Sequence, residues 1–167
     1  MLNFGRDAEK KAKNASTDEG GDDRDGLAVT IRARANSILF VREQWKEHST
    51  DSEEEPLSKL SLDQRLSFWI RRFSQERIPS RFPYDLLGIV NVYENWDDEK
   101  SLSAAMRTDV MRILKRKELK LNGKDEKRVK DYVESVIKES HDSIKRLAEE
   151  LLAAQWIEAA YTAAGGD

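Results

Sequence analysis

The side chains that most often do catalytic or metal chemistry are scarce in this sequence. The chain has 167 residues, no cysteine and only two histidines, His48 and His141. Neither histidine belongs to a zinc-binding pattern, and the glycines do not cluster into a phosphate-binding loop. The 32 acidic residues single out no acid–base pair. We therefore expect no catalytic residues, no metal site, no cofactor and no small-molecule substrate.

Anion recognition is the chemistry that the sequence indicates most clearly. Between Gln64 and Phe82 the only acid is Glu76, and Phe68, Trp69 and Phe73 lie among the arginines. Cations that follow a phosphate backbone beside rings that stack on bases are typical of single-stranded nucleic-acid binding. Alternatively, the rings belong to the core and the arginine stems lie along it. The candidate residues for binding nucleic acid or an acidic partner here are Arg65, Arg71, Arg72, Arg77 and Arg81.

A second basic segment runs from Arg107 to Lys130. Three of its basic residues are spaced away from the apolar positions Met106 and Val110, as on the exposed face of a helix. Such a helix could contact DNA in a helix-turn-helix unit. Basic side chains near a helix C-terminus are also explained by the helix dipole alone. The candidate residues here are Arg112, Lys115 and Arg116.

Acidic residues are gathered between Glu43 and Asp63, so the formal net charge of −3 conceals segments of opposite sign. Segregated charge affects association more than fold. An alternative function is therefore that of an acidic mimic or inhibitor that occupies a basic site on another protein.

One short pattern suggests a different class of function. Five residues separate Arg42 from His48 near the end of a predicted helix. This spacing resembles the Arg-x4–6-His motif of HEPN ribonucleases, which are small helical bundles that dimerise. The resemblance covers seven residues and implies that His48 acts in RNA cleavage while Arg42 orients the phosphate. A solvated helix end explains the same residues without catalysis.

The elements that must position these side chains are predicted to be helices. The chain has only eight glycines and three prolines, too few for the turns of an all-β fold. Apolar residues at helical spacing predict a first helix over 27–48, although Leu27, Val29 and Ile31 also alternate as in a strand. A capping-box pattern at Ser61 and Gln64 begins the second helix. Further helices follow Pro83 and Ser101.

The last apolar pattern is the longest, from Val129 to Tyr161. It predicts one helix of about 35–40 residues, far longer than the mean of about 11–12. The other helices of a small monomer cannot cover such a length, so we expect it to be both the spine of a bundle and a surface for self-association. The residues predicted to form that surface are Val129, Val133, Val136, Ile144, Leu147 and Leu151.

Together these patterns predict an all-α bundle of about five helices with a long C-terminal helix and a disordered N-terminal tail. The predicted organisation is a charged tail at 1–26, one helical domain at 27–163 and a flexible end at 164–167. No segment has the length of apolar sequence that a membrane span requires, and without cysteines or a signal sequence the cytoplasm is the expected location. We expect a non-catalytic subunit or adaptor that self-associates and binds a protein partner, DNA or RNA.

Overall fold

The computed structural model describes Arg6 and residues 26–32, 38–44, 53–93, 99–116, 119–139 and 141–165. These residues are mostly helical, with a long C-terminal helix, so the predicted bundle of about five helices is confirmed; a two-stranded sheet is added to it. The predicted tail lies outside the described residues except for Arg6 and Gly26. None of the described helices is long and apolar enough to cross a membrane. The elements are β1 (Gly26–Arg32), β2 (Ile38–Gln44), the 3-10 turn η3 (Leu57–Lys59), α2 (Leu62–Ser74), α3 (Phe82–Tyr93), α4 (Glu99–Arg116), α5 (Gly123–Glu139) and α6 (His141–Ala163).

The helix predicted over 27–48 is wrong, because β1 and β2 pair there as an antiparallel hairpin. Val29 lies opposite Val41, and Ile31 lies opposite Leu39. Residues directly opposed in a sheet share a face, so the hairpin gathers its apolar side chains on one side. This period-two alternation, rich in β-branched residues, is compatible with an antiparallel pair. The apolar face then packs against the helical core.

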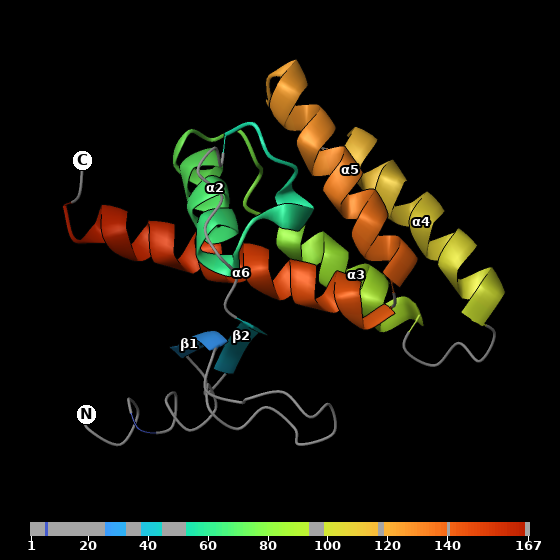
Figure 1. The fold of residues 1–167 in the computed structure, drawn as a ribbon, viewed down its shortest axis with the longest axis horizontal. Helices are drawn as coiled ribbons and strands as arrows, with labels where there is room; N and C mark the ends of the chain where they lie inside the picture. The colour runs from blue at the N-terminus through green and yellow to red at the C-terminus, as the bar shows by residue number, and fades with distance from the viewer. Residues whose placement is uncertain are drawn as a thin grey trace.

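Helix α6 is the centre of the fold (Figure 1). Leu151, Leu152, Ala153 and Ala154 are all buried, and four successive residues of a helix point in every direction around its axis. The helix is therefore covered on all sides along this stretch, as expected for a helix that is apolar all round. Helices α2 and α3 and the hairpin supply the cover, since each contacts α6.

The single long helix predicted from Val129 to Tyr161 is instead two helices, α5 and α6. Residues 138–143 are six consecutive polar positions between the apolar residues Ile137 and Ile144. This interruption lets each helix bury its own apolar stripe on a different partner. In Figure 1, α5 runs beside α4, whereas α6 turns away and runs beneath α2 and α3.

Two polar residues fix where helices begin. Gln64 accepts a hydrogen bond from the backbone N–H of Ser61 at 3.3 Å, which confirms the predicted capping box at the start of α2. Asn122 accepts one from the N–H of Asp125 at 2.8 Å. Asn122 and Gly123 therefore mark the start of α5, because the Asn122 side chain satisfies an N–H of the first turn.

Candidate binding sites

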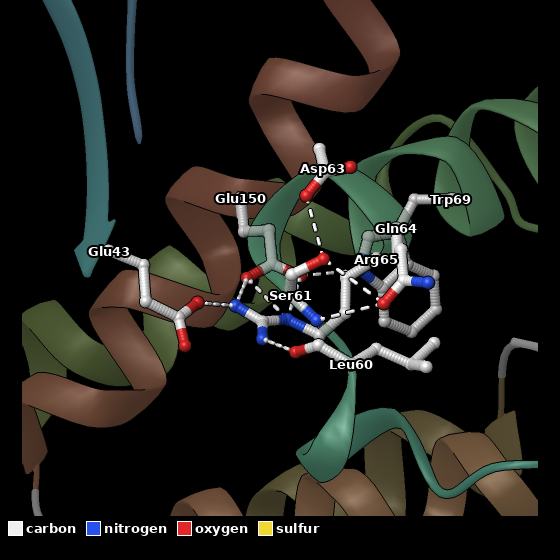
Figure 2. Close-up of polar contacts among 8 residues, drawn as sticks. All are labelled: Glu43, Leu60, Ser61, Asp63, Gln64, Arg65, Trp69 and Glu150. Carbon is white, nitrogen blue, oxygen red and sulfur yellow. Dashed lines mark hydrogen bonds and ion pairs between the residues drawn. The ribbon is translucent and has the colours of Figure 1, made fainter. Parts of the chain in front are cut away.

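Arg65 lies in the interior of the molecule, with only 6% of its side chain exposed. Its Nε donates to both carboxylate oxygens of Glu150 at 3.0 and 3.2 Å, and its Nη1 donates to the carbonyl of Leu60 at 2.7 Å. Its Nη2 pairs with Glu150 at 3.0 Å and also with Glu43 (Figure 2). The predicted role of Arg65 in binding an external anion is wrong, because two carboxylates of the same chain already neutralise its charge.

The partners of Arg65 come from separate elements. Glu43 is two residues from Val41 on β2, so both lie on the face that packs on the core. Glu150 lies on α6, where it also accepts a hydrogen bond from Trp69 Nε1 at 2.7 Å. Burial is the largest influence on the pKa of Arg65 and would lower it, but Glu150, Tyr132 and Glu43 together outweigh burial and the pKa is raised. The cluster therefore joins α2, α6 and the hairpin.

A hollow of about 690 Å³ lies between β2, α2, α5 and α6, and the cluster forms part of its lining. Its lining mixes bases such as Arg42 and Arg146 with acids such as Glu139 and Glu149. Burial raises the pKa of Glu149, while Lys145 and Arg146 act in the opposite direction. Because both signs of charge are interspersed, the hollow offers no single preference for an anion or a cation.

A second cleft forms around Phe68, and we call it the Phe68 cleft. The guanidinium carbons of Arg72 and Arg128 lie 4.9 and 5.1 Å from the centroid of the Phe68 ring. Asp125, which is buried, pairs with Arg72 at 2.7 Å and with Arg128 at 3.9 Å. The cleft has a volume of about 350 Å³. Its lining residues are Glu53, Asp63, Gln64, Ser67, Phe68, Arg71, Arg72, Asn122, Lys124, Asp125 and Arg128.

The Phe68 cleft brings the two basic segments of the sequence together. Arg71 and Arg72 come from the first segment, and Lys124 and Arg128 come from the second. A backbone hydrogen bond from Lys120 N–H to the carbonyl of residue 77, at 3.0 Å, joins the same two segments. Lys124 and Arg128 were not singled out as binding residues, since the α2 residues that line the cleft with them are distant in sequence.

A third hollow lies between α3 and α4, and we call it the α3–α4 groove. It has a volume of about 630 Å³. Tyr84 and Val92 are among the large hydrophobic side chains that remain exposed, at 49% and 72%. An added Cβ at Gly88 would meet nothing within 4 Å, so the groove is open at that point. The lining residues are Arg81, Tyr84, Asp85, Gly88, Ile89, Val92, Tyr93, Asp109, Ile113 and Arg116.

The α3–α4 groove also joins the two basic segments, through Arg81 and Arg116. Arg81 pairs loosely with Asp85 at 3.4 Å and is 81% exposed. Arg116 makes no ion pair within the part of the chain that the structure describes, and it is exposed. Tyr93 donates its hydroxyl proton to Asp109 at 2.7 Å, which raises the pKa of Tyr93.

The remaining predicted binding residues line neither of these two sites. Arg112 and Lys115 are exposed on α4, as their spacing predicted, and Arg112 pairs with Asp109. Arg77 is half-buried in the segment after α2. The predicted basic face of α4 is therefore present, whereas contact with DNA stays a prediction.

The six residues predicted for self-association are all buried within one chain. Those on α5 and those on α6 belong to a single hydrophobic core. They do not form the exposed seam that the prediction required, because the break between α5 and α6 lets both stripes turn inward. Self-association through other residues stays a prediction. The six residues are Val129, Val133, Val136, Ile144, Leu147 and Leu151.

The Arg42–His48 pattern does not have its predicted setting. Arg42 lies on strand β2 rather than near the end of a helix, and His48 lies outside the described residues. The structure therefore provides no geometry for a shared active site of these two residues.

Several of the described acids of the acidic segment pair with basic residues of the same chain. Glu43 pairs with Arg65, as described above. At the surface, Glu53 pairs with Arg71 at 3.6 Å, and Glu54 pairs with Lys124 at 3.0 Å. A role as an acidic mimic or inhibitor that binds a basic protein site stays a prediction.

Comparison with known proteins identifies no relative: no protein-family model, curated protein sequence or solved structure matches this chain.

Proposed function

We propose that this chain is a non-catalytic interaction module that holds an acidic, amphipathic segment of a partner protein in the α3–α4 groove. One observation carries the proposal: Tyr84 and Val92 are exposed within a groove that also contains Arg81 and Arg116. The chain would act as a subunit or adaptor in a larger assembly.

The apolar part of the groove supplies the reason for a partner to bind. Val92 has no polar group and is 72% exposed, and Tyr84 exposes half of its surface. They lie close to Ile89 and Ile113 in the same lining. Burying such side chains contributes about 25 cal/mol for each Å² of apolar surface removed from water. A grouped apolar surface in a hollow is a typical mark of a protein-interaction site.

The basic residues of the groove determine the preferred charge of the partner. Arg116 has no ion-pair partner within the described residues, and the carboxylate of Asp109 in the lining is already paired with Arg112. The Arg81–Asp85 pair at 3.4 Å, in which Arg81 is 81% exposed, contributes at most about 1 kcal/mol. Both guanidinium groups can therefore turn towards carboxylates of a bound segment. Such complementary charges raise the rate of association and favour acidic partners over basic ones.

A protein segment fits the groove better than a nucleic acid does. Tyr84 is the exposed ring of the lining, and the carboxylates of Asp85 and Asp109 also line the groove. A single-stranded nucleic acid needs several rings for stacking and a continuous line of cations. The apolar residues at Ile89, Val92 and Ile113 instead match the side chains of an amphipathic helix.

The test is a titration of the full chain with an amphipathic helical peptide that carries leucine anchors and glutamates. We expect amide signals of α3 and α4 to shift in NMR spectra. The double variant Arg81→Glu/Arg116→Glu should weaken binding about tenfold or more, and Val92→Glu should do the same. The matched control Lys127→Glu/Lys138→Glu changes the same number of charges on exposed residues of α5.

Three results would contradict the proposal. The peptide could cause no shifts in α3 and α4, or the control variant could weaken binding as much as the groove variant does. Finally, single-stranded DNA or RNA could bind the groove more tightly than the peptide at the same salt concentration, which would identify a nucleic acid as the partner.

A further inference from the structure

The Phe68 cleft contains more positive than negative charge. Arg71, Arg72, Lys124 and Arg128 line it, opposed by three carboxylates. Asp125 is the buried one of the three acids and lies between Arg72 and Arg128. One carboxylate there cannot fully neutralise two guanidinium groups. Burial lowers the pKa of Arg128, and the nearby Arg72 cation acts in the same direction against Asp125. An additional anion would relieve this repulsion.

Arg72 also has a hydrogen-bond donor that is not used. Its Nη2 pairs with Asp125 at 2.7 Å, and its Nη1 donates to Gln75 at 3.3 Å. Its Nε is buried, yet it has no acceptor within the described part of the chain. Buried donors in folded proteins are almost always paired with the protein, water or a ligand. Asp125 Oδ2 is also buried without a hydrogen bond, although it lies 2.7 Å from Arg72 Nη2. The cleft therefore holds an unpaired donor and an unpaired acceptor, and the donor can be satisfied by an acceptor from outside the chain, either water or an anion.

The other two cations are held loosely at the rim of the cleft. Arg71 lies 3.6 Å from Glu53, and the two side chains are 67% and 83% exposed. Lys124 pairs with Glu54 at 3.0 Å, again with both side chains exposed. Exposed pairs of this kind contribute little because water and salt screen them. Both cations can leave these partners and close on a ligand in the cleft.

From the cavity, the four cations and the unpaired donor we propose that the Phe68 cleft binds the phosphate group of a small molecule. A phosphate presents several acceptor oxygens and a double negative charge, which match a cluster of guanidinium donors. The cleft volume of about 350 Å³ leaves room for more than the phosphate. This site is separate from the α3–α4 groove.

The experiment measures the binding of inorganic phosphate and of glycerol phosphate to the full chain by NMR, with ionic strength held constant by sodium chloride. We expect shifts at α2 and at the start of α5, and tighter binding of phosphate than of chloride. The double variant Arg71→Gln/Lys124→Gln should weaken binding about tenfold. The matched control Lys127→Gln/Lys138→Gln removes two exposed basic residues of α5 that line neither site and should leave phosphate binding unchanged.

Because Arg71 and Lys124 are exposed, their replacement should not disturb folding, and circular dichroism checks this. Tighter binding of glycerol phosphate than of inorganic phosphate would support an organic phosphate as the ligand, and equal binding would support free phosphate. The proposal is overturned if phosphate at millimolar concentration causes no shifts at the cleft. It is equally overturned if both double variants bind alike, or if chloride competes as well as phosphate does.

Discussion

Arg65 and Glu150 are charged, yet each side chain is about as buried as the apolar core around it. Removing one partner of such a pair would strand a buried charge, at a cost of about 3–5 kcal/mol. The pair also selects the register of the hairpin. A slip of β2 by one residue would turn Glu43 away from Arg65 and move Val41 out of the core. A polar cluster and an apolar contact therefore specify the same arrangement.

Tyr132 provides a test of this cluster through pH. Its ring lies 5.6 Å from the guanidinium of Arg65, and burial, followed by the charge of Glu150, raises its pKa. A raised pKa in the folded state means that the unfolded chain loses the tyrosine proton first, at a pH of about 10. Below that pH, Tyr132 adds nothing to the pH dependence of the free energy of unfolding. Above it, stability falls as pH rises.

We therefore expect Tyr132→Phe to lose less stability than the unmodified chain between a pH of about 9 and about 11. Urea unfolding at each pH measures this difference. Tyr84→Phe is the matched control, since Tyr84 is half exposed on α3, and it should follow the unmodified chain. Parallel curves for Tyr132→Phe and the unmodified chain would show that the phenol is not protected by the cluster.

Some of these residue environments could be predicted and others could not. Arg65 lies three residues after Leu62 and four before Trp69, so its position on the apolar stripe of α2 was visible in the sequence. Its partner Glu150 lies 85 residues away, and no local pattern identifies it. Arg112 and Arg116 were predicted to be exposed and are exposed, because that depends only on the spacing within one helix.

Among the elements, the helices with sharp boundary signals were the most predictable. The capping box at Ser61 and the proline at position 83 located the starts of α2 and α3. The hairpin was not predicted, because its apolar residues satisfy both a period of two and a period near four. The choice between them depends on packing against α6, which local sequence does not contain.

The start of α5 gives a prediction at this scale. Asn122 caps the helix through the 2.8 Å hydrogen bond to the N–H of Asp125, so Asn122→Ala should lower the free energy of unfolding by about 1 kcal/mol. Asn91→Ala is the matched control, because Asn91 is exposed within α3 and alanine favours a helix interior. Chemical denaturation measures both. An equal effect of the two substitutions would show that Asn122 is not acting as a cap.

At the scale of the whole molecule, the fold combines segments that are far apart in the sequence. The basic segments of α2 and α4–α5 were each recognised separately, but their meeting at the Phe68 cleft and the α3–α4 groove was not predicted. Their meeting depends on α6 passing beneath α2 and α3 while α5 turns back along α4 (Figure 1). That path requires the break between α5 and α6. The break was not predicted, because the apolar residues on both sides of it have the same helical spacing.

Because α6 lies at the centre of the fold, a substitution on it can test whether its apolar residues form the core of one chain or an interface between copies of the chain. Leu151 is fully buried within one chain, so Leu151→Ala should lower the free energy of unfolding by about 2–5 kcal/mol at every protein concentration. Val92→Ala is the control, since Val92 is exposed and should change stability by less than about 0.5 kcal/mol. If Leu151 instead contributed to a contact between copies, the unfolding midpoint would rise with protein concentration and the loss would shrink. Thermal unfolding over a wide range of concentrations, with light scattering to report the mass, separates the two outcomes.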